Sequence, residues 1–474
     1  MSQQDNEAQS PAKSSEITAE LANFALTPVD FPSDVHAAGI RSFVNIVGCA
    51  LGGLHHPVSD LAYEVNSEFV GAPVATLIGR GRLADVLSAA YLNCLAASAH
   101  AFDDTHLPTV LHPAAPVASA LFALVDRQLA AAQTIAAPRA PISGQAFLEA
   151  FTLGIEIQCR LGVALLLPPA QGQIGWYASG VAGGVAAAAT SARLLGLSAE
   201  QTRWALGIAA NQASGFRQTH GSMCTSFTPA HAARCGLHST LLAERGFTAS
   251  DAALEGANGY FDVFAKRANP GAAVAGLSRT WHVLDNAFKP YPCGIVIHPV
   301  LDACLALVQS TRDRSFEATK VAAVKVAVNP LCLTLCDRPA PSSSQLAQVS
   351  VQHWTAAALI RGRAGLAEGS EECVHDTAVM ALRAKVSAKS DPAIARDAGV
   401  VVIEMQNGER FEERVEHCIG STQNPMTDAQ LTEKFLHQAT PVLGAGPGKA
   451  LLEQCWSLHD SPSVAELLEG SVPD

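Results

Sequence analysis

The sequence predicts a mainly α-helical protein, in which both ends of the chain form one large helical domain and a smaller α+β domain is inserted between them. Apolar residues recur at intervals of three and four through most of residues 17–275, as along one face of a helix. Strand-like alternation is rare there and becomes clear only after Trp281. The expected segments are a disordered tail at 1–16, a helical domain at 17–275, an α+β domain at 276–420 and a return to the helical domain at 421–474.

Long periodic runs and capping signals mark the helices of the large domain. Ser198 and Gln201 have the spacing of a capping box, directly after the stop signal at Gly196. The helices on either side have faces rich in Ala and Gly, so we expect them to pack as an antiparallel pair. The predicted helices are 83–101, 144–167, 178–195, 199–213 and 230–245.

The inserted domain combines strands with helices. Its predicted elements are a strand at 321–329, helices at 349–361 and 370–379, and a hairpin of 400–405 with 410–417. The strand at 321–329 is rich in Val and has a polar face at Lys325. Asn407 and Gly408 are the residues that a type I′ hairpin turn favours. A second capping box, Thr427 with Gln430, opens the return to helix, which extends to residue 468.

Composition excludes several classes of protein. With 49% hydrophobic and 16% charged residues, this chain of 474 residues is not expected to be disordered. The formal net charge of −12 argues against nucleic-acid and anionic-membrane partners, because both are bound through clusters of Lys and Arg. It leaves room for an anionic small molecule, since a local pocket can be positive on a negative protein. No run of about 18 uncharged apolar residues occurs, so the sequence predicts no membrane span.

Targeting and cofactor signals are also missing from the pattern. Residues 1–16 are polar and contain no arginine, so we expect neither a secretory signal nor a transit peptide, and a cytoplasmic location. The twelve cysteines have no C-x-x-C spacing and are expected to be reduced and buried. No Walker A, G-x-G-x-x-G or G-x-S-x-G motif occurs, which argues against nucleotide binding and serine-hydrolase chemistry.

The first candidate site segment, residues 101–113, reads AFDDTHLPTVLHP and follows an apolar helix. The side chains that a loop there could aim into one pocket are Asp103, Asp104, Thr105, His106 and His112. A carboxylate can orient a histidine or raise its pKa, which makes the ring a usable acid or base. The alternative is a helix end and a solvated loop, with Asp104 as a cap. A metal site is disfavoured, because the spacing of these Asp and His residues matches no common ligand pattern.

Two further segments place polar groups at predicted helix starts. Tyr177 follows a tryptophan between the glycines of residues 172–180, where a helix N-terminus favours an anion. It is a candidate acid or base if a cation lowers its pKa. In residues 220–234, Thr225 and Ser226 are candidate substrate ligands. The structural alternatives are a packed aromatic pair in the first segment and ordinary N-capping in the second.

The fourth segment, residues 288–299, reads FKPYPCGIVIHP. Lys289 lies in a stretch stiffened by two prolines, and a stiff, partly desolvated lysine is well suited to hold a carboxylate or to act as an acid. His298 leads the next predicted helix and is a further candidate ligand. The alternative is a proline-rich domain linker.

Together these segments resemble the MmgE/PrpD family, whose members include 2-methylcitrate dehydratase, cis-aconitate decarboxylase and iminodisuccinate epimerase. The resemblance extends from about residue 21 to residue 468. Its motifs are ATLIGRG at 75–81, FDDTH at 102–106, GW at 175–176, AAAATSARLLGLSAEQ at 186–201, LGIAANQASG at 206–215, GSM at 221–223, AARCGL at 232–237, LEGANGYFDVF at 254–264, FKPYPC at 288–293 and NPMT at 424–427. It implies a large helical domain, an inserted lid domain and a homodimer, without metal or organic cofactor.

Departures from the family pattern bear on the reaction. In the decarboxylase and dehydratase branches, a histidine usually takes the place of Tyr177 and a lysine the place that we align with Thr225. An aspartate is usual at Ala101, and the tyrosine of the lid helix corresponds to His353. The residues that match are Thr105, His112 and Lys289. The combination of GWY with MCTSF is most similar to the iminodisuccinate epimerase branch.

The resemblance therefore implies an epimerase that acts at the α-carbon of a di- or tricarboxylic acid. A lyase of the same family, either a dehydratase or a decarboxylase, is the alternative, and a non-catalytic carboxylate binder is the second alternative. An epimerase needs acid/base groups on both faces of the carbon, and we assign Tyr177 with either His112 or His353. Lys289 would hold a carboxylate, and Asp104 would orient a histidine. The hydroxyls of Thr105, Thr225 and Ser226 would bind substrate oxygens.

Overall fold

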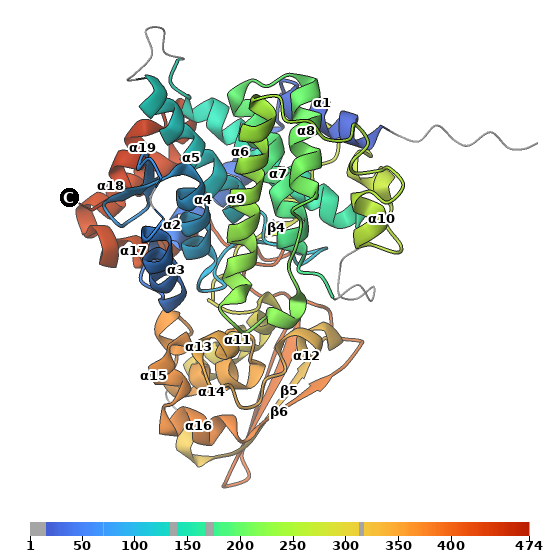
Figure 1. Cartoon of the computed structure of the whole chain (residues 1–474). Helices are drawn as coiled ribbons and strands as arrows, with labels where there is room; N and C mark the ends of the chain where they lie inside the picture. Colours follow the sequence, from blue (N-terminus) through green and yellow to red (C-terminus); the bar gives the residue numbers. More distant parts are fainter. Residues whose placement is uncertain (1–15, 70, 133–139, 166–174, 312–316, 474) are drawn as a thin grey trace, which may run out of the picture.

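A computed structural model describes residues 16–69, 71–132, 140–165, 175–311 and 317–473, so most of the predicted tail lies outside the described residues. The chain is mainly helical, as predicted. Figure 1 shows a large helical body above a smaller unit that contains the longest strands. The helices of the body are α1 (Ile17–Leu26), α2 (Ser33–Gly52), α3 (Pro57–Ser67), α4 (Val86–Ser98), α5 (Ala114–Ala132), α6 (Gly144–Ala164), α7 (Ala178–Leu195), α8 (Ala199–Ala210), α9 (Cys224–Glu244), α10 (Tyr260–Phe264), α17 (Asp428–Leu443), α18 (Ala445–Trp456) and α19 (Ala465–Gly470).

Small residues let the central helices of the body approach closely. Helix α9 packs on both α4 and α7, and a Cβ atom added at Gly236 would lie 2.5 Å from the carbonyl oxygen of Gly184 in α7. Both predicted capping boxes, at Ser198 and at Thr427, are present and open α8 and α17. Helix α17 packs against α2, so the C-terminal helices complete the core of the N-terminal ones (Figure 1).

Helix α2 is long and apolar enough to cross a membrane when judged by length and composition alone. In the structure, 67% of its apolar window is buried inside the protein, against α17, α4 and α6. A core helix has the same composition, because it too is surrounded by apolar side chains.

The smaller unit, which we call the α+β unit, has its own hydrophobic cluster of residues between Cys293 and Met405. Its helices and strands are α11 (His298–Ser310), β5 (Val321–Val328), α12 (Pro330–Cys336), α13 (Ser344–Ala347), α14 (Val351–Arg361), α15 (Glu371–Val374), α16 (Thr377–Arg383), β6 (Val386–Ser390), β7 (Gly399–Met405) and β8 (Arg410–Val415). The sheet order is β6-β5-β7-β8, with β5 and β6 parallel and the other pairs antiparallel. Helices α11 and α14 cover one face.

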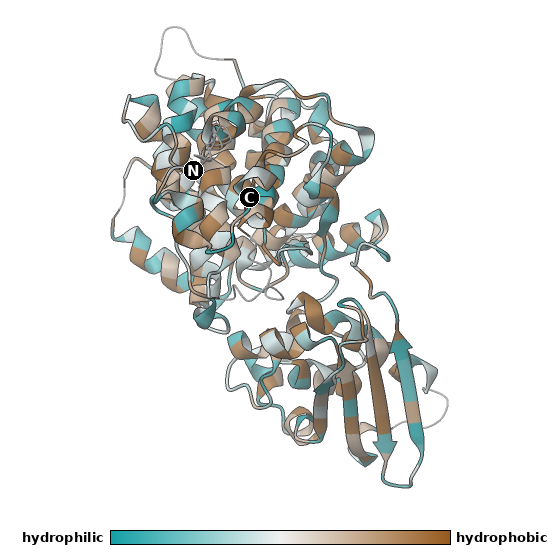
Figure 2. Cartoon of the chain, turned by 90° about the vertical axis from the view of Figure 1, so that its right-hand side faces the viewer, coloured by the Kyte–Doolittle hydropathy of each residue, from teal (hydrophilic) through white to brown (hydrophobic). Residues whose placement is uncertain are grey.

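Several predicted elements differ in detail. Residues 370–379 contain two helices, because α15 ends at Val374 and Asp376 caps the start of α16 with its side chain. Helix α9 begins at Cys224 rather than at residue 230 and continues through Pro229, which packing against α4 and α7 tolerates. Strand β6 was not predicted, since its residues are mostly exposed and lack apolar alternation. The edge strand β8 is also hydrophilic, beside the hydrophobic strand β7 (Figure 2).

The hairpin between β7 and β8 is present, but its predicted turn type is wrong. A type I′ turn needs positive φ at both central residues, and here Gly408 (φ 86°) has it while Asn407 does not. The N–H of Gly408 donates to the carbonyl of Met405, and the N–H of Met405 donates to Glu409. The loop is therefore one residue longer than the predicted turn, and only its glycine takes the left-handed conformation.

Two short antiparallel pairs complete the described strands: β1 (Ala75–Leu77) with β2 (Arg82–Ala84), and β3 (Thr105–His106) with β4 (Asn286–Ala287). The second pair joins the loop at 101–113 to the chain that enters the α+β unit. Nearby, the fully buried Arg160 pairs with Glu156 at 2.6 Å and donates to the carbonyls of Ala275 and Thr280. These contacts hold the end of the helical body from which the chain continues into the α+β unit.

Candidate active site

A cavity of about 70 Å³ lies where the helical body meets the α+β unit. Segments far apart in the sequence converge on it. Its polar lining includes Ser98, Asp103, His112, Tyr177, Arg217, His220, Thr225, Lys289 and Gln348, and its apolar lining includes Val110, Ile295, Val296, Leu335 and Val349. Four of the predicted segments therefore contribute to one enclosed space.

A buried ion pair forms one wall of this cavity. The ammonium of Lys289 lies 3.1 Å from a carboxylate oxygen of Asp103 and donates to the carbonyl of Ala101 at 3.0 Å. Burial by itself would raise the pKa of Asp103, but the charge of Lys289 and the hydrogen bond that it donates outweigh burial and lower that pKa. Asp103 is therefore an anion, and it holds the lysine in one position.

Lys434, on the returning helix α17, supports this pair from behind. Its ammonium donates to Asn45 at 2.7 Å, to the carbonyl of Phe102 at 2.7 Å and to the carbonyl of Lys289 at 2.9 Å. Burial lowers the pKa of Lys434 to about 8. One side chain thus fixes the backbone on both sides of the ion pair. Lys434 could not be selected from the sequence, because no local pattern distinguishes it from a surface lysine of an amphipathic helix.

His112 is held as a neutral base. Its Nδ1 lies 2.7 Å from the carbonyl oxygen of Asp104, and since a carbonyl can only accept, Nδ1 carries the proton. The other ring nitrogen, Nε2, therefore has a free lone pair. Burial lowers the pKa of His112 to about 4, against the opposing charge of Asp103. The predicted orienting role of Asp104 is thus filled by its backbone carbonyl rather than by its carboxylate.

The carboxylate of Asp104 is occupied elsewhere. It accepts hydrogen bonds from Asn286 at 2.6 Å and from the N–H of Ala114 at 3.3 Å. Burial raises its pKa to about 7. These contacts tie the loop to β4 and to the start of α5, so Asp104 is a positioning residue at the base of the site.

Tyr177 lines the same cavity. Its side chain is buried directly before α7, and its ring centroid is 6.3 Å from that of His112 and 4.5 Å from that of His220. Burial and the nearby negative charge of Asp103 raise its pKa, whereas the prediction required a cation to lower it. Tyr177 is therefore a neutral phenol, which can donate a proton but is a poor base.

Arg217 and His220 are lining residues that the sequence analysis did not select. In Arg217, Nε and one terminal nitrogen are buried without a hydrogen-bond partner, and so is Nε2 of His220. Burial, followed by the charge of Arg217, lowers the pKa of His220 to about 3. The only sequence signal was a cation between two glycines, Gly215 and Gly221. A buried guanidinium without a partner is a binding site for an anion, most simply a carboxylate.

The remaining predicted residues do not line the cavity, except Thr225, whose hydroxyl accepts from the N–H of Gly221 at 3.2 Å. Ser226 donates to the carbonyl of Ser98. Thr105 contacts Nδ1 of His112 at 3.2 Å. His106, His298 and His353 are fully buried elsewhere.

His353 does not lie where its predicted role as an acid or base would require. It lies in α14 with Nε2 at 2.8 Å from the carbonyl of Glu368, inside the α+β unit. His298 begins α11, as predicted, and its ring packs on Tyr291 at 5.4 Å. Neither ring reaches the cavity, because each is enclosed by its own unit's side chains.

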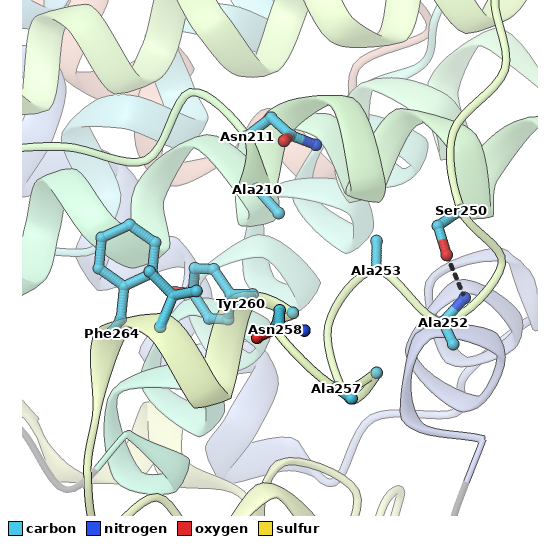
Figure 3. A pocket seen from close by; sticks show the side chains of 12 residues that line it. Ala210, Asn211, Ser250, Ala252, Ala253, Ala257, Asn258, Tyr260 and Phe264 are labelled. Atoms are coloured by element: carbon cyan, nitrogen blue, oxygen red, sulfur yellow. Dashed lines mark hydrogen bonds between the residues drawn. The ribbon is translucent and has the colours of Figure 1, made fainter.

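A second space of about 430 Å³ lies on the helical body, between the end of α8 and the loop before α10 (Figure 3). Alanine, glycine, asparagine and serine make up most of its lining. Its tyrosine, Tyr260, donates its hydroxyl to the carbonyl of Val181. With no cation, carboxylate or histidine in its described lining, this space lacks the chemistry of the interdomain cavity.

Burial of neutral histidines predicts acid unfolding. Burial lowers the pKa of His112, His100 and His353 to about 4, and that of His220 and His298 to about 3. An unfolded histidine has a pKa of about 6.5, so the unfolded chain binds more protons below that pH. We expect each of these buried histidines to lower the free energy of unfolding at pH 5 by about 1–2 kcal/mol relative to neutral pH.

Urea unfolding at a series of pH values tests this. The midpoint should be constant between pH 8 and pH 7 and fall steeply from pH 6.5 to pH 5. An unchanged midpoint at pH 5 would mean that these histidines are charged in the folded protein.

The chain is similar to known proteins along most of its length. The model described as the MmgE/PrpD N-terminal domain matches residues 19–273, and that of the MmgE/PrpD C-terminal domain matches residues 291–458. A cis-aconitate decarboxylase from Aspergillus terreus is 29% identical, over 98% of this chain and 97% of its own length. The cis-aconitate decarboxylase-like protein oryM from Aspergillus oryzae is 28% identical, over 95% and 96%. The Mus musculus cis-aconitate decarboxylase is 28% identical, over 81% and 79%.

Proposed function

Because the chain belongs to the MmgE/PrpD family of enzymes, we propose that it is a lyase that releases carbon dioxide from an unsaturated tricarboxylic acid of the cis-aconitate type. This replaces the epimerase that the departures at Tyr177 and Thr225 favoured. The curated relatives that cover most of the chain are named cis-aconitate decarboxylase or, for oryM, cis-aconitate decarboxylase-like protein, which supports the lyase alternative.

The observation that carries the proposal is an excess of buried positive charge beside two neutral proton carriers. Arg217 and Lys289 both line the cavity, and Asp103 provides the only carboxylate among its described lining residues. An acid with several carboxylates would compensate this charge, and it would give the unpartnered nitrogens of Arg217 their missing acceptors. His112 and Tyr177 stand beside the same space with opposite abilities, one to accept and the other to donate a proton.

The chemistry follows from these positions. As the bond to the departing carboxylate breaks, its electron pair forms a new carbon–carbon double bond. The electrons of the original double bond then take a proton at the carbon beside a second carboxylate. Tyr177 donates this proton, and water replaces it after product release, so each turnover consumes one proton and releases one carbon dioxide. Arg217 and Lys289 hold the carboxylates that remain and stabilise the charge that develops on them.

A dehydratase of the same family is the second candidate, and the geometry of His112 favours it. Loss of water from a hydroxy acid begins with removal of a proton beside a carboxylate. Nε2 of His112 has a free lone pair for that step, whereas decarboxylation needs no base. Both lyases use the same carboxylate-binding residues, so they differ in the substrate and in which proton carrier works first.

Substrate entry requires the two parts of the molecule to separate. The cavity of about 70 Å³ is well below the range of about 300–1,000 Å³ that is usual for ligand sites. It shares Val110, Ile295 and Val296 with an outer chamber of about 490 Å³ between the same two parts. We infer that the α+β unit is a lid, whose movement joins chamber and cavity and whose closure excludes water.

Incubation of the full chain with cis-aconitate in deuterated water tests the proposal. The expected product has one deuterium bound to carbon and appears with one equivalent of carbon dioxide, as measured by proton NMR and a coupled carbon dioxide assay. The control is the double variant Lys289→Met with Asp103→Asn, which removes both charges of the buried pair together and should be inactive.

Other outcomes would contradict it in distinguishable ways. Water loss from 2-methylcitrate or citrate without carbon dioxide would identify a dehydratase. Deuterium exchange at the carbon beside a carboxylate of a dicarboxylic acid, without loss of water or carbon dioxide, would identify an epimerase instead. Thermal stabilisation by such acids without any turnover would indicate a non-catalytic binder.

A further inference from the structure

Outside the cavity, His106, His282 and Asp285 lie together, with one potential ligand atom of each within 4.8 Å of the others. His106 belongs to β3, at the end of the Asp-Asp-Thr-His stretch. The other two belong to the short helix His282–Asp285, directly before β4. The β3–β4 pairing brings the two segments together, so the cluster is invisible in sequence spacing.

His106 has the environment of a metal ligand. The side chain is fully buried, and its Nδ1 lies 2.7 Å from the hydroxyl of Thr109. Its Nε2 is buried without a hydrogen-bond partner. Metal-binding histidines are characteristically oriented by a hydrogen bond to the other ring nitrogen. A buried ring nitrogen without a partner costs free energy, which a bound ion would offset.

His282 and Asp285 lie where they could share a metal ion with Nε2 of His106. The rings of His106 and His282 stand edge to face, with centroids 6.0 Å apart. His282 and Asp285 are reached by solvent, so their side chains can rotate onto an ion that enters from the outside.

We propose that His106, His282 and Asp285 form a binding site for a divalent transition-metal ion of the zinc class. Two imidazoles and one carboxylate leave a fourth position for water, which is a common ligand set for Zn²⁺. None of the three residues lines the cavity, although Asp285 lines the outer chamber, so the ion would not contact the reacting groups in the closed protein.

Its position gives the site a structural consequence. His106 lies within the loop that carries Asp103 and His112, and the segment that begins at His282 leads to Lys289. An ion would cross-link these segments in addition to the β3–β4 hydrogen bonds. Bound metal should therefore stabilise the arrangement of the buried ion pair and raise the melting temperature of the protein.

Titration of the chelator-treated full chain with Co²⁺ and with Zn²⁺ tests this site. We expect one ion per chain, visible absorption from Co²⁺ in a low-symmetry site that Zn²⁺ displaces, and a higher melting temperature. Asp285→Asn and His282→Asn should each weaken binding at least tenfold. Both side chains are reached by solvent, and circular dichroism checks that the variants fold.

His417→Asn is the matched control, since His417 and Asp397 form an exposed histidine–carboxylate pair at 2.7 Å. It should leave binding unchanged. The proposal is overturned if both cluster variants bind Co²⁺ as tightly as the parent, if no ion binds, or if only His417→Asn weakens binding, which would indicate an adventitious ion only. Binding and melting are measured without substrate, so they are independent of the proposed reaction.

Discussion

Replacing Tyr177 by phenylalanine should lower kcat by about 10²- to 10⁴-fold, the usual contribution of a positioned acid. The change removes one oxygen and keeps the ring that packs on His112 and His220. Because the phenol donates in the transition state and Arg217 and Lys289 hold the substrate, KM should change little. Steady-state kinetics on the substrate identified by deuterium incorporation would measure both constants.

Tyr260→Phe is the matched control for this substitution. Tyr260 is equally buried in the same helical body, and its hydroxyl donates to the carbonyl of Val181 at 3.1 Å, away from the cavity. We expect it to cost about 1 kcal/mol of stability and to leave kcat unchanged. Equal turnover in parent, Tyr177→Phe and Tyr260→Phe would remove Tyr177 from the mechanism and leave His112 as the proton carrier.

The parts of the fold that could be predicted are those with local causes. The capping boxes at Ser198 and Thr427 satisfy backbone N–H groups within three residues, so their sequence is sufficient. Strand β6 could not be predicted, because what makes it a strand is its parallel pairing with the distant β5. The break at Asp376 was missed for a related reason: the residues on either side are helical, and only the cap separates them.

The residues of the candidate site also divide into those that local sequence could identify and those that depend on distant parts of the chain. Asp103, His112, Tyr177 and Lys289 were selected because each stands in a distinctive local stretch, and all four line the cavity. Arg217 was missed, since nothing in its neighbourhood shows that its guanidinium is buried without a partner. His353 was selected from an alignment to a lid-helix tyrosine, but its ring faces the carbonyl of Glu368. Sequence gives the type of a side chain, whereas its direction depends on packing.

Arg217→Met should have opposite effects on activity and on stability. Loss of the guanidinium removes a buried partner for a substrate carboxylate, which should lower kcat/KM by about 10²- to 10³-fold, or about 3–4 kcal/mol. In the ligand-free protein the same group is a buried charge without a hydrogen-bond acceptor, and burial lowers its pKa. Replacing it with an apolar side chain of similar length should therefore raise the unfolding free energy by about 1 kcal/mol.

The two effects together separate a substrate-binding arginine from a structural one. A structural arginine would lose stability on substitution, as expected for Arg160, whose guanidinium is paired with Glu156 and three backbone carbonyls. Arg203→Met, at an exposed pair with Asp251, is the matched control and should change neither quantity measurably. Arg217→Lys should recover part of kcat/KM, since it restores the charge without the planar fork. A destabilised Arg217→Met protein with parental kcat/KM would place the substrate carboxylates elsewhere, because the guanidinium would then be satisfied within the folded chain.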